Sequence, residues 1–206
     1  QGFKPSRIEF IHTLNHSRSG VPVVPRRLLP LSIKTRLGFD CVVVERWVEH
    51  LLEARPAAIT LHGRTLQQMY RGAADWSAIA EAAKLAHGTG TLMLGNGDLN
   101  TLVDAIRRAA ESKVQGVLVG RGTLGSPWFF REKEQARRAF SERDDLSTLP
   151  ATAWEPPVSV SHRMQVMLDH ARQYEAIAGL ERFRSIRKHL GWYCKGFPHA
   201  AAMRGK

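Results

Sequence analysis

The sequence contains little cysteine and no long apolar run. Only two of its 206 residues are cysteines, Cys41 and Cys194, and they form neither a C-x-x-C pair nor a cluster with histidine. We therefore predict neither a disulfide framework nor a metal site, and we expect the reducing environment of the cytoplasm. A helix that spans a membrane needs roughly 18 apolar residues, and the sequence offers no such run and no N-terminal signal region. We expect a soluble protein without a membrane partner.

Acidic residues are also scarce relative to basic ones. The chain has 30 lysines and arginines against 19 aspartates and glutamates, which gives a formal net charge of +11. An excess of positive charge favours a polyanionic partner, and nucleic acid is the first candidate. Charge alone leaves open the alternative of a basic protein without such a partner.

Apolar periodicity divides the chain into regions of different character. Residues 1–30 are interrupted by four prolines and are predicted to be irregular. The pattern then becomes regular: strands are expected at residues 31–35, 57–61, 91–94 and 115–119, and helices at residues 42–54, 75–86, 99–111 and 123–130. This alternation is typical of parallel βα units whose strands are buried on both faces. The predicted fold class is α/β.

The remainder of the chain reads differently. Residues 131–157 begin with a highly charged stretch and continue into a segment rich in serine, aspartate and proline, which predicts a helix and a linker. Amphipathic helices at residues 158–177 and 180–194 predict a small all-helical domain over residues 158–206. An eight-stranded parallel barrel needs about 250 residues. Four βα units therefore form either half a barrel or a small open sheet, and periodicity alone does not choose between them.

Each predicted strand ends in a polar or glycine-rich cluster. These clusters contain Lys34 and Arg36, then residues 62–65, then residues 96–98, and finally residues 120–122. In parallel βα folds the loops after the strands converge on one face, and the last two loops commonly bind phosphate. A phosphorylated ligand is therefore predicted. Lys34 lies within an apolar strand, and a buried lysine requires an acceptor that a ligand can supply.

The last two clusters have the composition of an anion site. Asn96, Gly97 and Asp98 are predicted to open the following helix, so that main-chain N–H groups point into the loop. Gly120 lets the main chain approach an anion that Arg121 can bind with two hydrogen bonds. Alternatively, Asp98 is a helix N-cap and Arg121 a surface charge. Residues 120–125 also spell G-x-G-x-x-G, but a dinucleotide fingerprint belongs to a first βα unit and not to the last.

Several of these strings, taken in order, resemble motifs of one known family. They are SIKTRLG at 32–38, ITLHGRT at 59–65, LGNGD at 94–98 and VLVGRGTLGSPWFF at 117–130. They resemble successive motifs of the tRNA-dihydrouridine synthases, and RSIRKHLGWYCKGFPHAA at 184–201 resembles the C-terminal helical domain of that family. The resemblance implies the C-terminal half of a TIM (β/α)8 barrel over residues 31–130, followed by a helical tRNA-binding domain.

The resemblance also implies a cofactor, a reaction and site residues. The cofactor is FMN, and the reaction is reduction of uridine to 5,6-dihydrouridine in tRNA with NADPH as reductant. Lys34 and His62 would contact the isoalloxazine ring, and the ribityl phosphate would be held by Asn96, Gly97, Asp98, Gly120 and Arg121. Arg36 and Arg64 would lie near the substrate uracil or the tRNA backbone, and tRNA would also contact Arg187, Lys188 and Lys195, with Trp192 and Tyr193 among them.

No catalytic residue is predicted in this chain. The acid cysteine of the family belongs to an N-x-G-C-P motif that does not occur in the sequence, and the N-terminal strands of the family barrel are also missing. Half a barrel leaves strand edges uncovered. We therefore expect a fragment of a longer protein, a degenerate relative, or a half completed by self-association or by a partner chain, inactive alone. The alternatives are a non-catalytic tRNA-binding protein and a barrel enzyme acting on a small metabolite.

Overall fold

The computed structural model describes residues 29–141, 150, 153 and 158–205. The chain divides into two compact units, residues 1–30 and residues 31–206, and all of the elements below belong to the second. The predicted irregular segment therefore lies almost wholly outside the described residues. The finer division at residues 131–157 and 158–206 stays a prediction.

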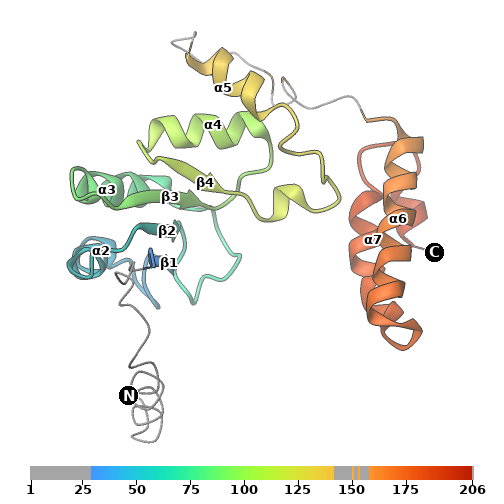
Figure 1. Ribbon diagram of the computed structural model, residues 1–206, viewed down its shortest axis with the longest axis horizontal. Helices are drawn as coiled ribbons and strands as arrows, with labels where there is room; N and C mark the ends of the chain where they lie inside the picture. Colours follow the sequence, from blue (N-terminus) through green and yellow to red (C-terminus); the bar gives the residue numbers. More distant parts are fainter. Residues whose placement is uncertain (1–28, 142–149, 151–152, 154–157, 206) are drawn as a thin grey trace, which may run out of the picture. The chain divides into compact units, whose positions relative to one another are not determined.

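Four parallel strands form one sheet in the order β1-β2-β3-β4 (Figure 1). The strands are β1 (Ser32–Arg36), β2 (Ala58–His62), β3 (Leu92–Asn96) and β4 (Gly116–Leu118), and they alternate with α2 (Val44–Glu53), α3 (Trp76–Ala86) and α4 (Leu102–Glu111). The predicted α/β class is confirmed, and the sheet is consistent with part of a TIM barrel.

One face of the sheet packs against the helices. Ile59 and Leu61 of β2 and Met93 of β3 are almost fully buried, in a core that also contains Val48 of α2 and Ile79 of α3. Because side chains alternate along a strand, the even-numbered residues of β1, β2 and β3 lie on the opposite face. The expectation that every strand is buried on both faces is wrong for the edge strand β1, in which Lys34 is exposed.

Two predicted helix positions differ from the structure. The helix after β3 does not open at residues 96–98: α4 begins at Leu102, because the Thr101 side chain caps it by accepting from the Asp104 N–H at 3.0 Å. No α-helix forms at residues 123–130, where a single 3-10 turn, η1 (Arg121–Thr123), is followed by further turns. Gly125 has a φ of +70°, which an α-helix does not allow.

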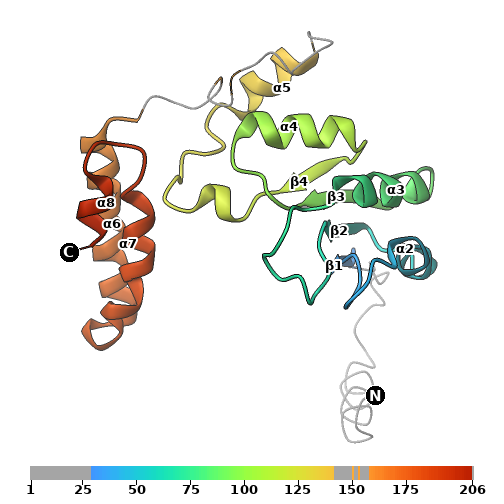
Figure 2. The same cartoon turned by 180° about the vertical axis from the view of Figure 1, so that it is seen from behind.

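The C-terminal part of the described chain is helical (Figure 2). Its elements are α5 (Lys133–Ser141), α6 (Val160–Ala178), η2 (Leu180–Ile186), α7 (Arg187–Tyr193) and α8 (Ala200–Arg204). The helix predicted at residues 180–194 is thus divided into a 3-10 helix and an α-helix. No helix in the described part of the chain has the length and apolarity that crossing a membrane requires.

Candidate functional site

The register of the sheet aligns polar residues at the carboxyl ends of its strands. Arg36 of β1 pairs with His62 of β2, His62 pairs with Asn96 of β3, and Asn96 pairs with Leu118 of β4. Lys34 precedes Arg36 by two residues and therefore lies on the same face of β1. The alternation of the sequence thus brings these side chains to one end of one face, as parallel βα architecture predicts.

A cavity of about 230 Å³ lies at this end of the sheet. All of the residues predicted to contact the cofactor line this cavity: Lys34, His62, Asn96, Gly97, Asp98, Gly120 and Arg121. Arg36, which was predicted to lie near the substrate, also lines it. Arg64 does not line the cavity, because its side chain is only 2% exposed. Sequence reasoning did not assign a role to Tyr70, Leu99, Asn100 or Leu118, which also line it.

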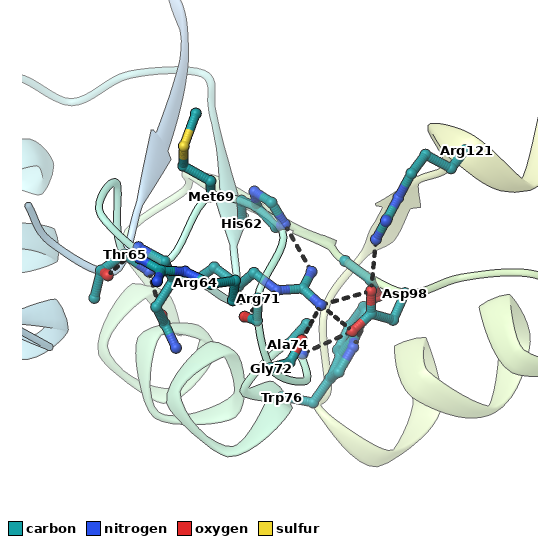
Figure 3. Close-up of polar contacts among 12 residues, drawn as sticks. His62, Arg64, Thr65, Met69, Arg71, Gly72, Ala74, Trp76, Asp98 and Arg121 are labelled. Carbon is teal, nitrogen blue, oxygen red and sulfur yellow. Dashed lines mark hydrogen bonds and ion pairs between the residues drawn. The ribbon is translucent and has the colours of Figure 1, made fainter.

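Arg64 and Asp98 form the centre of the polar network beside the cavity (Figure 3). The Arg64 guanidinium donates to both oxygens of Asp98, at 2.6 and 2.8 Å, and to the Gly72 carbonyl at 2.6 Å. Asp98 also accepts from the Ala74 N–H at 2.7 Å and from Arg121 at 2.9 Å. Asp98 therefore joins three loops and is not a helix N-cap. Arg121 is held by a carboxylate of the chain itself.

The carboxyl group of Asp98 is stabilised as an anion. Burial opposes its ionisation, but the hydrogen bonds from Arg64 and the Ala74 N–H, together with the charges of Arg64 and Arg121, outweigh burial and hold the pKa of Asp98 below its usual value of 3.8. Asp98 is therefore ionised at neutral pH, and its negative charge is matched by Arg64.

At neutral pH, where Asp98 is charged, His62 is uncharged. Burial, followed by the positive charges of Arg36, Lys34 and Arg64, lowers the pKa of His62 from 6.5 to about 4. The Nε2 atom of His62 lies 3.4 Å from a guanidinium nitrogen of Arg64. Because a guanidinium can only donate, Nε2 accepts and the ring proton resides on Nδ1. His62 thus presents a neutral donor.

The loop after β2 is held by arginine side chains. Arg36 donates to the main-chain carbonyls of Thr65 at 2.9 Å and Met69 at 3.4 Å. Within the same loop, the Thr65 N–H donates to the Gln68 side-chain oxygen at 2.7 Å. The Arg36 contacts join the end of a strand to the main chain of a distant loop. Such contacts cannot be predicted from the periodicity of the sequence.

The cavity has the chemistry of an anion site. Among the described residues that line it, Lys34, Arg36 and Arg121 contribute positive charge and Asp98 is the only carboxylate. No atom lies within 4 Å of the position that a Cβ on Gly120 would take, so the main chain is open to a ligand there. Within the described residues, the main-chain N–H groups of Asp98 and Gly120 donate no hydrogen bond. This donor set fits a phosphate group.

The cavity is small for a complete cofactor. Pockets that bury a drug-sized ligand measure roughly 300 to 1,000 Å³, and this one measures about 230 Å³. It can therefore enclose a phosphate and the part of a ligand next to it, while the remainder of the ligand requires further walls.

The other predicted residues lie away from the cavity. Arg187 and Lys188 of α7 are exposed, and the Lys195 ammonium donates to the Leu124 carbonyl at 2.9 Å. Cys41 is exposed just before α2 and Cys194 is buried after α7, so neither lines the cavity. Among the described residues, no group of three or more His, Cys, Asp or Glu side chains is arranged to hold a metal ion.

The fold and the site together define a class: a parallel βα protein, consistent with part of a TIM barrel, with a cationic cavity at the carboxyl ends of its strands. Residues 17–206 match the sequence model of a protein family that is described as dihydrouridine synthase (Dus). The chain belongs to this family. The match begins earlier than the motifs indicate, since it includes residues 17–30.

Individual relatives carry the same description. The chain is 35% identical over 184 residues to a probable tRNA-dihydrouridine synthase of Mycobacterium leprae, covering 85% of this chain and 43% of that protein. It is 32% identical to probable tRNA-dihydrouridine synthase 1 of Synechocystis, covering 85% and 46%, and 31% identical to the probable enzyme of Aquifex aeolicus, covering 85% and 50%. The chain spans about half the length of the curated relatives that it matches.

Proposed function

We propose that this chain provides part of the FMN site of a tRNA-dihydrouridine synthase, an oxidoreductase that reduces uridine to 5,6-dihydrouridine in tRNA with NADPH as reductant. One observation carries the proposal: the residues expected at the cofactor from four separate stretches of sequence line a single cationic cavity. Membership of the family supports the reaction. A tRNA substrate implies a cytoplasmic location.

The loops after β3 and β4 would hold the phosphate end of FMN. The main-chain N–H groups of Asp98 and Gly120 would donate to the phosphate, and Arg121 would supply positive charge. The Asp98 carboxylate does not contact the phosphate, because like charges repel; it positions Arg121 and Arg64. Because Arg64 is buried behind the cavity lining, it would position Asp98 and would not contact tRNA directly.

Residues of β1 and β2 would hold the ring end of FMN. Lys34 is exposed, so its ammonium group could donate to a ring carbonyl, and neutral His62 could donate from Nδ1. When bound, FMN supplies the electrons that reduce the C5–C6 bond of uridine. Arg36 lies at the rim of the cavity, where one guanidinium edge holds the loop after β2 and the remainder faces the substrate uracil or the RNA backbone.

The site requires groups from outside this chain. Neither cysteine lines the cavity, so the acid that protonates C5 comes from elsewhere. The β1 edge also presents an apolar surface that includes Phe39, Val43, Trp47 and Leu66. An uncovered strand edge with apolar neighbours favours addition of further structure. We propose that the remaining half of the barrel, or a second copy, covers this edge and that the chain alone is inactive.

Residues 158–206 are proposed as a helical tRNA-binding domain. Arg187 and Lys188 project from α7 without burial, which is the arrangement that phosphate contacts need. Lys195, beside Trp192 and Tyr193, lies close to the loop after β4 through its contact with Leu124. These residues would attract tRNA independently of the flavin site.

A flavin titration tests the cofactor assignment. FMN and riboflavin share the ring system and differ in the phosphate, so riboflavin is a matched control ligand. We expect the chain to bind FMN weakly, but at least about tenfold more tightly than riboflavin, and Arg121→Ala to abolish this preference. Equal binding of the two flavins would contradict the phosphate site, and tight binding of FMN by a monomer would contradict the incomplete site.

The position of the two cysteines outside the cavity favours a second candidate function: a tRNA-binding protein without catalysis. A gel-shift assay with tRNA distinguishes it. A shift that is independent of FMN, together with no dihydrouridine when the rest of the barrel is supplied, would support this function. Dihydrouridine formed only by the completed assembly would exclude it.

A further inference from the structure

Trp76 is buried beside the anion site but has no part in the proposed function. It is the first residue of α3, whose start is fixed by the Asp75 side chain, which accepts from the Ala78 N–H at 2.9 Å. The indole lies directly against β3, because a Cβ on Gly95 would come within 2.4 Å of Trp76 Cζ3. The strand therefore makes room for this ring by carrying a glycine.

The indole N–H of Trp76 holds one main-chain carbonyl. Trp76 Nε1 donates to the Gly97 carbonyl at 3.1 Å, and Figure 3 shows the Trp76 side chain beside Asp98. Within the described residues, no other group donates to this carbonyl. A buried carbonyl is costly to leave unpaired. The hydrogen bond therefore fixes the direction in which the Gly97 carbonyl points.

The same peptide unit carries the N–H of Asp98. The described residues contain no cis peptide bond, and in a trans peptide the C=O and the N–H point in opposite directions. The Gly97 carbonyl points to the buried indole, whereas Gly97 and Asp98 line the cavity and Trp76 does not. The bond from Trp76 therefore turns the Asp98 N–H away from the core and towards the cavity.

This peptide unit is held in a conformation that is not relaxed. The φ angles of Gly97 and Asp98 are +134° and +50°, and a Cβ on Gly97 would lie 2.5 Å from the Ala74 Cβ. Rotation of the peptide unit would bring the φ of Asp98 to a negative value, which suits a non-glycine residue, and would turn its N–H out of the cavity. The hydrogen bond from Trp76 opposes that rotation.

We propose that Trp76 is a positioning residue of the phosphate site: its indole N–H holds the Gly97–Asp98 peptide unit so that the Asp98 N–H faces the phosphate. This inference rests on the proposed function and assigns the orientation of one phosphate donor to a residue behind the site. Trp76 does not touch the ligand. Because an N–H that donates to an anion makes the carbonyl of its own peptide a stronger acceptor, phosphate strengthens the Trp76 bond in turn.

NMR of the indole N–H groups observes this coupling in the complete chain. The chain has five tryptophans, and Trp→Phe substitutions made one at a time identify their resonances in protein labelled with ¹⁵N-tryptophan. Inorganic phosphate should move the Trp76 indole proton downfield. The Trp47 indole, which donates to the Thr35 hydroxyl at 2.8 Å and does not line the cavity, should stay in place.

Flavin binding by Trp76→Phe measures the consequence. The variant keeps an aromatic ring but lacks the N–H, so its preference for FMN over riboflavin should fall at least about fivefold. Its affinity for riboflavin, which has no phosphate, should stay within about twofold of the wild type. Trp47→Phe is the matched control, since it also removes an indole N–H, and it should keep the preference.

The outcomes separate the positioning role from the phosphate site itself. A wild-type preference for FMN in Trp76→Phe, or a Trp76 indole resonance that phosphate leaves unmoved in a chain that prefers FMN, would overturn the proposal alone. Equal weakening of both flavins would assign Trp76 to folding. If Trp76→Phe does not fold, the phosphate titration of the wild-type indole decides. A wild-type chain that binds FMN no better than riboflavin would overturn the proposed function, and the positioning role with it.

Discussion

The two groups of basic residues in this protein differ in surroundings more than in residue type. Arg64 at the sheet is 2% exposed and bound to Asp98, whereas Arg187 and Lys188 on α7 are exposed and, within the described residues, form no ion pair with a carboxylate. A buried pair fixes geometry and is little affected by salt, while exposed charges act over distance and are screened. The first group is therefore suited to building a site and the second to attracting a polyanion.

The largest expected effect is that of breaking the buried pair. Arg64→Met leaves the Asp98 carboxylate without its main partner and the main-chain carbonyls of Arg71 and Gly72 without this donor. We expect the free energy of unfolding to fall by about 3 kcal/mol, the lower end of the range for buried pairs, because Asp98 keeps partial contact with solvent. Urea denaturation measures this change.

An exposed pair provides the control for that measurement. Arg172 and Asp169 on α6 are 3.2 Å apart with both side chains well exposed. Arg172→Met should change the free energy of unfolding by no more than about 0.5 kcal/mol. Equal effects of the two substitutions would contradict the distinction between the two groups.

The pH dependence of stability should show the neutral state of His62. The pKa of His62 is about 4 in the folded protein and 6.5 when unperturbed, so the unfolded state binds more protons between these values. Stability is therefore lost as the pH falls from 7 to 5, and His62 accounts for about 2 kcal/mol of that loss. In His62→Gln this component disappears. An unchanged pH dependence in the variant would show that His62 is not held neutral.

The smallest effect on stability is expected from the exposed basic residues of α7. Arg187→Glu with Lys188→Glu should leave the free energy of unfolding within about 0.5 kcal/mol of the wild type. The same substitutions should weaken tRNA binding and reduce the slope of log affinity against log salt concentration by about 1 to 2. Filter binding over a salt series measures the slope. An unaltered slope would remove these residues from the proposed tRNA surface.

The strands could be predicted from the sequence because their signals are local. Apolar runs followed by glycine-rich clusters located all four strands to within two residues, and parallel pairing then brought Lys34, His62 and Asn96 together. The polar clusters at the strand ends followed from the same reasoning, whereas their assignment to FMN came from the resemblance to the family. The other lining residues, among them Leu99 and Asn100, were assigned no role from the sequence.

The failures concern contacts that the local sequence does not encode. Asp98 has the composition of an N-cap, but Thr101 caps α4 and Asp98 binds Arg64, which is 34 residues distant. Lys34 was expected to be buried, but it is exposed on β1, which lies at the edge of the sheet that the described residues form. Tyr70 lies in a stretch that resembles the family but was assigned no role, because its place in the cavity lining depends on contacts that the local sequence does not encode.

The central claim is that the loops after β3 and β4 bind the phosphate of FMN, and phosphorus NMR tests it most directly. On addition of the wild-type chain, the FMN phosphorus resonance should shift and broaden, and the chain with Gln67→Ala, an exposed change outside the cavity, should behave in the same way. Arg121→Ala should leave the resonance at its free position. A phosphorus resonance that stays unmoved by the wild-type chain, while the flavin absorbance changes, would contradict the account.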